Sequence, residues 1–397
     1  MISIDNFNFN SKKALVRVDF NVPLDKETLT ITDDKRIKAA LPTLQKILSD
    51  KGSAIVMSHL GRPKNGPEDK FSLRHIMNRI HELTGAKVYF AQDCIGEEAE
   101  SLAKKLAPGE ILLLENVRFY AEETKGDDSF AKQLSKLGDC YVNDAFGTAH
   151  RAHASTCQIA QFFPNAKMCG FLMEKEIQSA KVVMEEAKRP FTAIVGGAKV
   201  SDKVLIVENL IQTADHIIIG GGMAYTFKKA LGGNIGNSLC EDERLNNCLD
   251  ILKLAKEQGV HIHLPKDSII ADDFSNGANV NTAESDDIQE NWMGLDIGPI
   301  ASKDFSKVIL NSKTILWNGP MGVFEMPSFE HGTKSIAKAV AEATANGAYS
   351  LIGGGDSAAA AKKFDVDQSV SHVSTGGGAL LEYFEGKTLP GIQAIEA

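Results

Sequence analysis

The sequence lacks the features that mark secreted, metal-stapled and membrane proteins. Its 397 residues include only six cysteines, and no two of them form a Cys-x-x-Cys pair. This pattern fits neither a disulfide framework nor a zinc site, and it favours free thiols in a reducing compartment. No apolar run approaches the ~20 residues of a membrane span, and no basic stretch followed by an apolar one opens the chain as a secretory signal would. We therefore expect a soluble, cytoplasmic protein.

Positive charge is also scarce, with 43 Lys and Arg against 52 Asp and Glu and a net charge of −9. An acidic protein has no general attraction for nucleic acids or anionic membranes, so we expect neither as a partner. An anionic small-molecule ligand would need positive charge gathered at one place. The chain length predicts two domains rather than one.

Short apolar runs alternate with segments of helical periodicity along the whole chain. We expect strands at residues 14–18, 54–58, 87–90, 111–114, 140–143, 192–195, 216–219, 261–264, 314–317, 350–352 and 371–374. We expect helices at 36–49, 73–84, 99–106 and 243–258, and a helix at 171–188 that is either another surface helix or a connection between domains. Apolar strands separated by helices predict an α/β fold with doubly wound, Rossmann-like parallel sheets.

In the first half of the chain, charged and amide side chains follow the expected strands. Ligands bind beyond the carboxyl ends of strands in open α/β sheets, and guanidinium groups match phosphate and carboxylate. One such arginine is usually a solvated surface charge and one such histidine a packed ring, but the repetition predicts a site for a small polyanion. The residues are Asp19, Asn21, Arg36, His59, Arg62, Arg118, His150, Arg151 and His153.

In the second half, the expected strands run into glycine clusters at residues 196–197, 220–222, 353–355 and 376–378. A glycine cluster alone is usually a tight turn, but before a helix it exposes backbone N–H groups to an anion. Lys199 and Lys203 are four residues apart, which predicts a phosphate clamp on one helical face. Residues 317–325 are either a nucleotide wall, with Glu325 at the ribose, or a structural turn capped by that glutamate.

A dinucleotide-binding enzyme is the competing class. No Walker-type phosphate loop is present, because Leu381 stands where the first glycine before Gly386-Lys387-Thr388 would be. Gly353-x-Gly355-x-x-Ala358 matches a degenerate dinucleotide pattern, which also requires an acidic residue ~20 positions later to hold the ribose. The next expected strand ends instead in Thr375-Gly376, which disfavours a dehydrogenase.

Together these motifs resemble those of phosphoglycerate kinases, in the same order and over the whole chain. The resemblance is carried by residues 17–23, 58–63, 115–119, 143–146, 150–151, 196–199, 220–224, 317–325 and 353–357. It implies two Rossmann-like domains joined by a central helix, with a deep interdomain cleft, and a monomer. The implied activity is reversible, Mg²⁺-dependent phosphoryl transfer from 1,3-bisphosphoglycerate to ADP, giving 3-phosphoglycerate and ATP. A catalytically inactive nucleotide-binding paralogue is the alternative.

The resemblance also implies domain boundaries and site residues. It places a 3-phosphoglycerate domain at 1–170, an interdomain helix at 171–188, a nucleotide domain at 189–378 and a returning segment at 379–397. The implied substrate-binding residues are Asp19, Asn21, Arg36, His59, Arg62, Arg118 and Arg151. The implied nucleotide-binding residues are Gly197, Ala198, Lys199, Lys203, Gly221, Gly222, Leu295, Asn318, Glu325, Gly353, Gly354, Gly355, Asp356 and Ser357, with Asp356 also holding Mg²⁺. Ser357 stands where the family commonly has threonine, which keeps the hydroxyl.

The expected mechanism needs no general base, because a carboxylate and a diphosphate are already ionised at neutral pH. It needs in-line positioning and neutralisation of charge on the transferred group. We assign this role to Arg36, Lys199, Lys203, Gly354 and Gly355. Since the two substrates are expected on different domains, the domains are expected to close by hinge bending.

Overall fold

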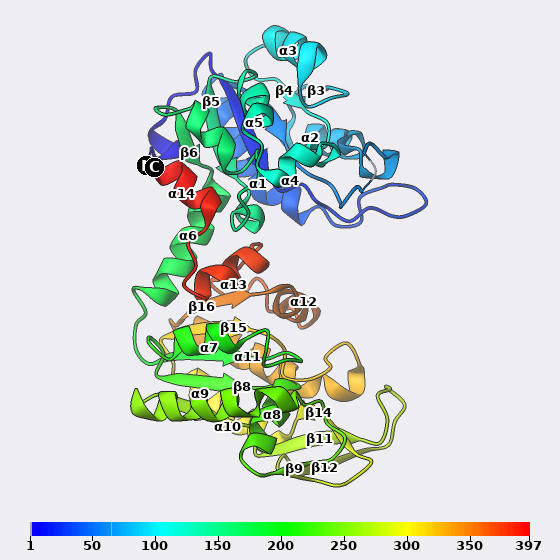
Figure 1. The fold of residues 1–397 in the computed structure, drawn as a ribbon, viewed down its shortest axis with the longest axis vertical. Coiled ribbons are helices and arrows are strands. Elements are labelled where there is room, and N and C mark those ends of the chain that lie inside the picture. The colour runs from blue at the N-terminus through cyan, green and yellow to red at the C-terminus, as the bar shows by residue number, and fades with distance from the viewer. Residues whose placement is uncertain (1, 65) are drawn as a thin grey trace. The chain divides into compact units, whose positions relative to one another are not determined.

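The computed structural model describes residues 2–64 and 66–397, which form two compact units (Figure 1). Unit 1 comprises Met1–Ile177 and Thr388–Ala397, and unit 2 comprises Gln178–Lys387. The boundary near Ile177 falls within α6 (Phe171–Met184), which is therefore shared by the two units.

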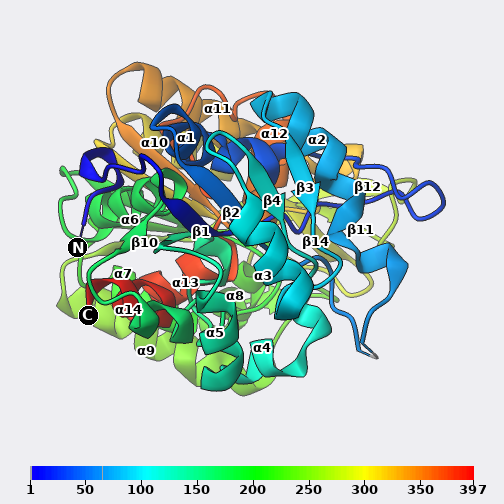
Figure 2. The same cartoon turned by 90° about the horizontal axis from the view of Figure 1, so that it is seen from above.

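Unit 1 is built on a six-stranded parallel sheet in the order β3-β4-β2-β1-β5-β6. Figure 2 shows β1, β2, β4 and β3 lying side by side in this order. The strands are β1 (Lys13–Val18), β2 (Ser53–Met57), β3 (Val88–Phe90), β4 (Ile111–Leu113), β5 (Cys140–Asp144) and β6 (Lys167–Cys169). All residues of β2, β4 and β5 are buried, as expected for a sheet with both faces covered.

The helices of unit 1 bury amphipathic faces. In α1 the residues Ile37, Ala40, Leu44 and Ile47 are buried, three or four positions apart, which is the spacing of one helical face. The α-helices are α1 (Lys35–Ser49), α2 (Met77–Thr84), α3 (Gly96–Lys105), α4 (Ala121–Lys125), α5 (Asp128–Ser135) and α14 (Pro390–Glu396). The 3₁₀ helices are η1 (Ile4–Asn6), η2 (Asp69–Phe71), η3 (Leu73–Ile76), η4 (Val117–Phe119), η5 (Phe146–Thr148) and η6 (Gln158–Phe162).

Unit 2 contains a second six-stranded parallel sheet, in the order β10-β8-β7-β15-β16-β17, which confirms the predicted α/β class with two parallel sheets. Its strands are β7 (Phe191–Val195), β8 (His216–Ile219), β10 (His261–His263), β15 (Thr314–Asn318), β16 (Tyr349–Gly353) and β17 (His372–Val373). The helices are α7 (Val204–Leu210), α8 (Met223–Ala230), α9 (Leu245–Glu257), α10 (Pro299–Leu310), α11 (His331–Ala345), α12 (Gly355–Lys363) and α13 (Gly378–Phe384), with η7 (Asp242–Arg244) and η8 (Pro327–Phe329).

An antiparallel sheet in unit 2 was not predicted. Its strands β11 (Asp267–Ala271), β12 (Val280–Glu284) and β14 (Met293–Ile297) run in the order β12-β11-β14. The edge strand β12 is largely exposed and polar, so it carries no apolar run for sequence analysis to detect. A two-stranded parallel pair, β9 (Asn234–Ile235) and β13 (Asp287–Ile288), lies apart from both sheets.

Two helix predictions need correction. The helix expected at 171–188 ends at Met184, and the chain then leads through Pro190 into β7. Lys199 and Lys203 do not share a helical face, because α7 begins only at Val204. The turn before it is held in another conformation, since Ser201 donates from its backbone nitrogen and its hydroxyl to Glu241 at 2.9 and 2.6 Å. Within the described residues, no helix combines the length and the apolar character that a bilayer crossing requires.

Candidate functional site

In unit 1, the loops after the strands are tied to one another by the side chains that the sequence singled out. Asp19, just after β1, accepts a hydrogen bond from Arg36 Nη1 at 2.6 Å. Asn21 Oδ1 accepts from the backbone nitrogen of Gly61 at 2.8 Å, which joins the loops that follow β1 and β2. Arg36 is the second residue of α1, so the helix start holds it at the same edge of the sheet.

His59 lies deep in this group of residues, with only 3% of its surface exposed. Its Nδ1 is 3.3 Å from Arg17 Nη2 and 3.9 Å from Asp19 Oδ1. Burial, followed by the positive charges of Arg17, Arg118 and Arg36, lowers the pKa of His59 well below its usual value. The ring is therefore neutral at pH 7 and offers a donor or acceptor without adding charge.

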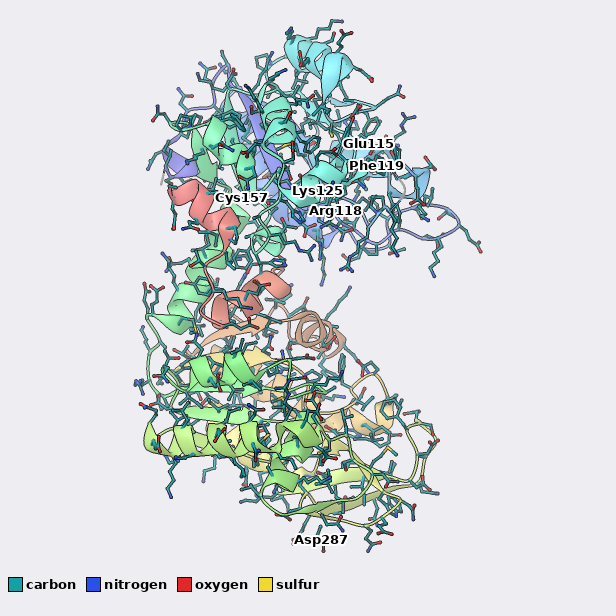
Figure 3. All side chains as sticks on the ribbon, in the orientation of Figure 1. Glu115, Arg118, Phe119, Lys125, Cys157 and Asp287 are labelled. Carbon is teal, nitrogen blue, oxygen red and sulfur yellow. The ribbon has the colours of Figure 1, made fainter. Side chains whose placement is uncertain are left out.

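Arg118 is half-buried in the 3₁₀ turn after β4, close to Glu115 and Phe119 (Figure 3). Its Nη1 donates to the carbonyl of Gly61 at 2.9 Å, while its Nε is buried and, within residues 2–64 and 66–397, has no hydrogen-bond partner. Burial, with the charges of Arg17 and Arg151, lowers the pKa of Arg118 to about 10. A buried guanidinium N–H without an acceptor is costly, and an anionic ligand would supply the acceptor.

The remaining positive groups of the cluster come from the segment after β5. Arg151 Nε donates to His150 Nε2 at 3.1 Å. Burial, with the charges of Arg118, Arg17 and Arg151, lowers the pKa of His153 to about 4. The structure thus brings Arg36, Arg118 and Arg151 together with the histidines. Arg62, by contrast, is exposed.

Sequence reasoning missed the buried support of this cluster. Arg17 is fully buried within β1, and its Nε donates to Ser155 Oγ at 2.8 Å. Ser155 Oγ in turn donates to Glu123 Oε1 at 2.7 Å, and the Ser155 backbone nitrogen donates to Glu123 Oε2 at 2.9 Å. Glu123 is also fully buried. The available signal was a charged residue within an apolar run, because such a residue must be paired when buried.

In unit 2, a cavity of about 470 Å³ opens at the carboxyl ends of the strands. We call it the glycine cavity, because the glycine turns after β7 and β8 line it. Seven of the predicted nucleotide-binding residues line it: Gly197, Ala198, Gly221, Gly222, Leu295, Glu325 and Asp356. Further lining residues that the sequence did not suggest include Tyr225, Leu239, Phe274 and Met293, while Met321 belongs to the 317–325 segment proposed as a nucleotide wall. Apolar walls with a few polar groups are typical of small-molecule sites.

The floor of the glycine cavity consists of backbone. Gly221 has a φ of +69°, and a Cβ there would lie 2.6 Å from the carbonyl of Gly197. The backbone nitrogen of Gly197 donates to Pro320 O and that of Gly221 to Met321 O, both at 3.1 Å. Three turns, after β7, β8 and β15, therefore touch through their main chains, which only glycine allows at Gly221.

Beside the cavity, the ends of β15 and β16 are linked by side chains. Lys203 Nζ donates to Asn318 Oδ1, and Asn318 Nδ2 donates to the carbonyl of Gly353 at 2.9 Å. Burial lowers the pKa of Lys203. Ser357 Oγ accepts from the backbone nitrogen of Gly319 at 2.6 Å. These predicted residues are held together, but they do not line the cavity itself.

The third glycine cluster lies at the start of a helix, α12, as the sequence predicted. Gly354 precedes the helix with a φ of +90°, and Gly355 and Asp356 begin it with their surfaces exposed. The N–H groups of a helix start carry a partial positive charge, which favours a phosphate there. Lys199 is exposed on the neighbouring turn, where its charge lies near Glu241.

Asp296 is a buried carboxylate beneath the glycine cavity. It follows Leu295 in β14 and accepts from the backbone nitrogens of Ile297 and Gly332 at 2.9 and 2.7 Å. Burial raises its pKa to about 8. It packs so closely under Gly322 that a Cβ there would overlap its carboxylate. Asp296 therefore fixes the loop that forms one wall of the cavity.

Comparison with known proteins gives one consistent result. A family model described as "Phosphoglycerate kinase" matches residues 4–387. The chain is 54% identical over 419 residues to a phosphoglycerate kinase of Porphyromonas gingivalis, covering 100% of each chain. It is 49% identical to that of Chloroherpeton thalassium, covering 99% of this chain and 98% of the relative. Among solved structures, phosphoglycerate kinase from Coxiella burnetii aligns with a TM-score of 0.90 at 39% identity, covering 100% of this chain and 98% of the other.

Proposed function

Because the chain belongs to the phosphoglycerate kinase family, we propose that the arginine cluster of unit 1 binds 3-phosphoglycerate and the glycine cavity of unit 2 binds ATP or ADP. The family activity is phosphoryl transfer with a carboxyl group as acceptor, a step of glycolysis, and the matches give no support to an inactive paralogue. The proposal concerns which residues perform this activity.

The unpartnered Nε of Arg118 is the observation that carries the substrate assignment. It lies among Arg17, Arg36, Arg151 and neutral His59, so positive charge is concentrated there in a protein of net charge −9. A molecule with a phosphate at one end and a carboxylate at the other would offer acceptors to several guanidinium groups at once. Asp19 and Asn21 would hold the loops and contact the substrate hydroxyl, and Arg62 would reach the substrate from solvent.

The glycine cavity suits a nucleotide because its volume lies in the range of ligand sites and its walls are apolar. We assign the purine to the pocket between Gly197, Gly221 and Leu295, the ribose to Glu325, and the phosphates to Lys199, Lys203, Asn318 and the start of α12 with Ser357. Cytoplasmic location and a monomeric state complete the proposal; a cytosolic Arabidopsis thaliana relative is 49% identical, although chloroplastic relatives also match.

Magnesium fits the glycine cavity as a companion of the nucleotide. Among the described residues, no group of three or more His, Cys, Asp or Glu side chains could hold a metal ion. Asp356 is a single carboxylate at the start of α12 and lines the cavity. Mg²⁺ usually takes one or two carboxylates together with substrate phosphates and waters, so Asp356 is the residue that would hold it. When bound, the ion would neutralise phosphate charge.

The proposed mechanism rests on positioning and charge. The carboxylate of 3-phosphoglycerate attacks the γ-phosphorus of ATP, the new C(O)–O–P bond forms, and the bond to the ADP oxygen breaks. Neither nucleophile carries a proton that must be removed. Arg36, Lys199, Lys203 and the N–H groups of Gly354 and Gly355 would stabilise the charge on the transferred group. Because reacting atoms must approach to ~3–3.5 Å, we propose that the two units close on each other when both substrates are bound.

Arg36→Ala tests this assignment. Comparable arginines contribute ~10³–10⁵ in kcat, so we expect kcat to fall at least a hundredfold. The assay mixes the purified chain with 3-phosphoglycerate, ATP and Mg²⁺ and follows the acyl phosphate through NADH oxidation by glyceraldehyde-3-phosphate dehydrogenase. Lys38→Ala, at an exposed position two residues further along α1, is the matched control and should leave kcat unchanged. Retention of more than about a tenth of kcat by Arg36→Ala would contradict its proposed role.

A further inference from the structure

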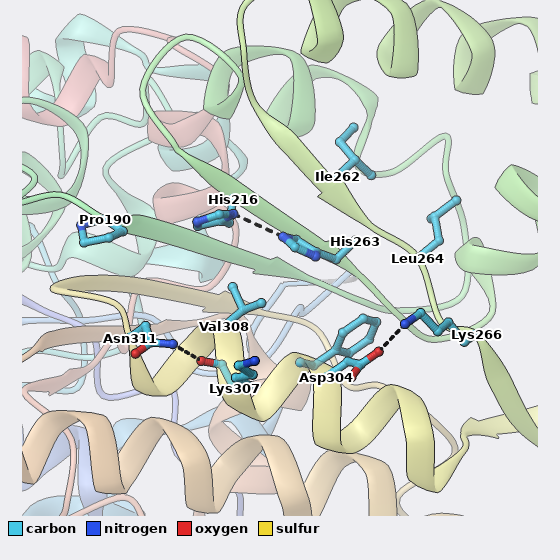
Figure 4. Close-up of a pocket in the computed structure, with 11 residues that line it drawn as sticks. Pro190, His216, Ile262, His263, Leu264, Lys266, Asp304, Lys307, Val308 and Asn311 are labelled. Atoms are coloured by element: carbon cyan, nitrogen blue, oxygen red, sulfur yellow. Dashed lines mark hydrogen bonds and ion pairs between the residues drawn. The ribbon is translucent and has the colours of Figure 1, made fainter.

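A second cavity in unit 2 lies between the edge strand β10 and helix α10, and has a volume of about 530 Å³ (Figure 4). It shares no lining residue with the glycine cavity. Its walls include Ile262, Phe305 and Val308, and the imidazole rings of His216 and His263 are among its polar lining groups. We call it the histidine cavity. The proposed kinase mechanism uses none of these residues.

Strand pairing brings the two rings together. β8 and β10 are parallel neighbours with His216 opposite His261, so the side chains of residues 216, 261 and 263 emerge on the same face of the sheet. His216 Nδ1 and His263 Nε2 are 3.1 Å apart, and their ring centres are 5.2 Å apart. The ring of His261 stacks on that of His216 at 5.4 Å.

Both rings of the pair are neutral at pH 7. Burial lowers the pKa of His263 to about 4 and lowers that of His216 below its usual value. A neutral imidazole has one nitrogen with a free lone pair, which is the form that coordinates metal ions.

We propose that His216 and His263 form a binding site for a late first-row divalent ion such as Cu²⁺, Ni²⁺ or Zn²⁺. Histidine nitrogens bind such an ion at ~2.0–2.1 Å, which places two adjacent ligand nitrogens roughly 2.8–3.4 Å apart in square-planar, octahedral or tetrahedral geometry. The 3.1 Å between His216 Nδ1 and His263 Nε2 is within that interval. Water entering from the open cavity completes the coordination.

Binding requires no net loss of protons. In the hydrogen-bonded pair, one of the two facing nitrogens carries a proton. On binding, that proton moves to the other nitrogen of the same ring, so His216 is protonated on Nε2 and His263 on Nδ1. Both rings remain neutral, and both facing lone pairs become available to the ion.

The charges facing the cavity limit the affinity. Asp304 of α10 is paired with Lys266 at 2.7 Å, and Asp215, beside His216, is paired with Arg189. Lys307 of α10 also lines the cavity and opposes a cation there. With two protein ligands and this opposing charge, the site favours ions at the strong-binding end of the series, in the order Cu²⁺ above Ni²⁺ above Co²⁺. Mg²⁺ prefers oxygen ligands and does not compete.

The test is a titration of the full-length protein with Ni²⁺, chosen because it is paramagnetic, followed by the histidine ring signals in NMR spectra. The chain has 10 histidines, so the readout distinguishes this pair from other metal-binding groups. We expect the signals of His216, His263 and the neighbouring His261 to broaden first. His263→Gln should raise at least tenfold the Ni²⁺ concentration needed to broaden the His216 signal, whereas the exposed His331→Gln in α11 should leave that concentration unchanged. Lys307→Gln should lower that concentration.

The outcomes separate this proposal from the kinase assignment. Activity with Mg²⁺ and no Ni²⁺ should be the same in His263→Gln and the unmodified chain, because the cavity is not part of the proposed kinase site. Broadening of all histidines at the same Ni²⁺ concentration would overturn the proposal, as would an unchanged titration of the His216 signal in His263→Gln. An affinity order with Co²⁺ above Cu²⁺ would also overturn it.

Discussion

Glu123→Gln perturbs the arginine cluster from its buried side, without changing the surface to which the substrate would bind. The carboxylate is fully buried and accepts two hydrogen bonds from Ser155, whose hydroxyl in turn accepts from buried Arg17. Glutamine keeps the acceptor for the Ser155 backbone nitrogen. It replaces the second acceptor with an NH₂ group, so the Ser155 hydroxyl loses the acceptor for its proton and Arg17 loses the negative charge behind it.

The size of the effect follows from these contacts. A hydrogen bond to a charged group contributes ~1.5–3 kcal/mol, and an uncompensated buried charge costs ~3–5 kcal/mol when its direct partner is removed. Since Ser155 stands between Arg17 and Glu123 and one hydrogen bond survives, we expect a loss of ~2–3 kcal/mol in the unfolding free energy of unit 1. Movement of Arg17 should also displace His59 and raise the KM for 3-phosphoglycerate severalfold.

Urea unfolding monitored by two signals is the appropriate assay, because a two-unit protein need not unfold in one step. Both tryptophans, Trp292 and Trp317, belong to unit 2, so their fluorescence is an internal control, whereas far-ultraviolet circular dichroism reports on both units. The exposed neighbour Glu122→Gln is the matched variant and should change neither signal. If Glu123→Gln and Glu122→Gln unfold at the same urea concentration, the buried network does not stabilise unit 1 as argued.

Three further predictions concern unit 2. Burial holds the pKa of Asp296 at about 8 against 3.8 in the unfolded chain, so ionisation penalises the folded state as pH rises from about 4 to about 8. Asp296→Asn should therefore gain unfolding free energy relative to the unmodified chain between pH 5 and pH 8. A difference in unfolding free energy that stays constant over this range would contradict the prediction. At Gly221, where φ is +69°, an added Cβ would clash with backbone. Gly221→Ala should therefore weaken ADP binding in calorimetry by about tenfold or more. Gly347→Ala is the control, since Gly347 has φ +92° but open space around it, and it should leave ADP binding unchanged. Asp356→Asn should raise the Mg²⁺ concentration for half-maximal activity without changing the KM for 3-phosphoglycerate, and an unchanged Mg²⁺ requirement would exclude it as the ligand.

The sequence predicted what depends on local pattern. Parallel strands with both faces covered are apolar from end to end, so β1, β2, β7 and β15 were found to within one residue at each end. The same pattern does not exist in β12, whose side chains are mostly exposed, and the antiparallel sheet was missed for that reason. Glycine clusters predicted the turns at the strand ends but not that Lys199 and Lys203 lie before α7, because Glu241, forty residues away in the chain, fixes that turn.

The site residues divide in the same way, into those that a local sequence pattern predicts and those that depend on distant contacts. Residues placed at strand ends could be assigned to one edge of a sheet from sequence alone, and Arg36, His59 and Arg118 do meet there. The buried Arg17–Ser155–Glu123 connection joins Arg17 to two residues that lie more than a hundred positions later in the chain, and no periodicity predicts such a pairing. Phe274 and Tyr225, which also line the glycine cavity, were missed. Phe274 lies in the loop between β11 and β12 of the unpredicted sheet, and the Tyr225 hydroxyl donates to Ser268 Oγ of β11 at 3.0 Å.

The main-chain floor of the glycine cavity has a thermodynamic consequence. Ordering a long side chain costs up to ~2 kcal/mol in rotamer entropy, and binding sites lined by such groups lose part of their affinity to it. At Gly197 and Gly221 there is no side-chain rotamer to order, and their backbones are already hydrogen-bonded to Pro320 and Met321 before any ligand arrives. A planar ring lying on this floor would meet a surface that is equally ordered in the empty and the occupied protein, so its binding should be accompanied by little change in the motion of these turns.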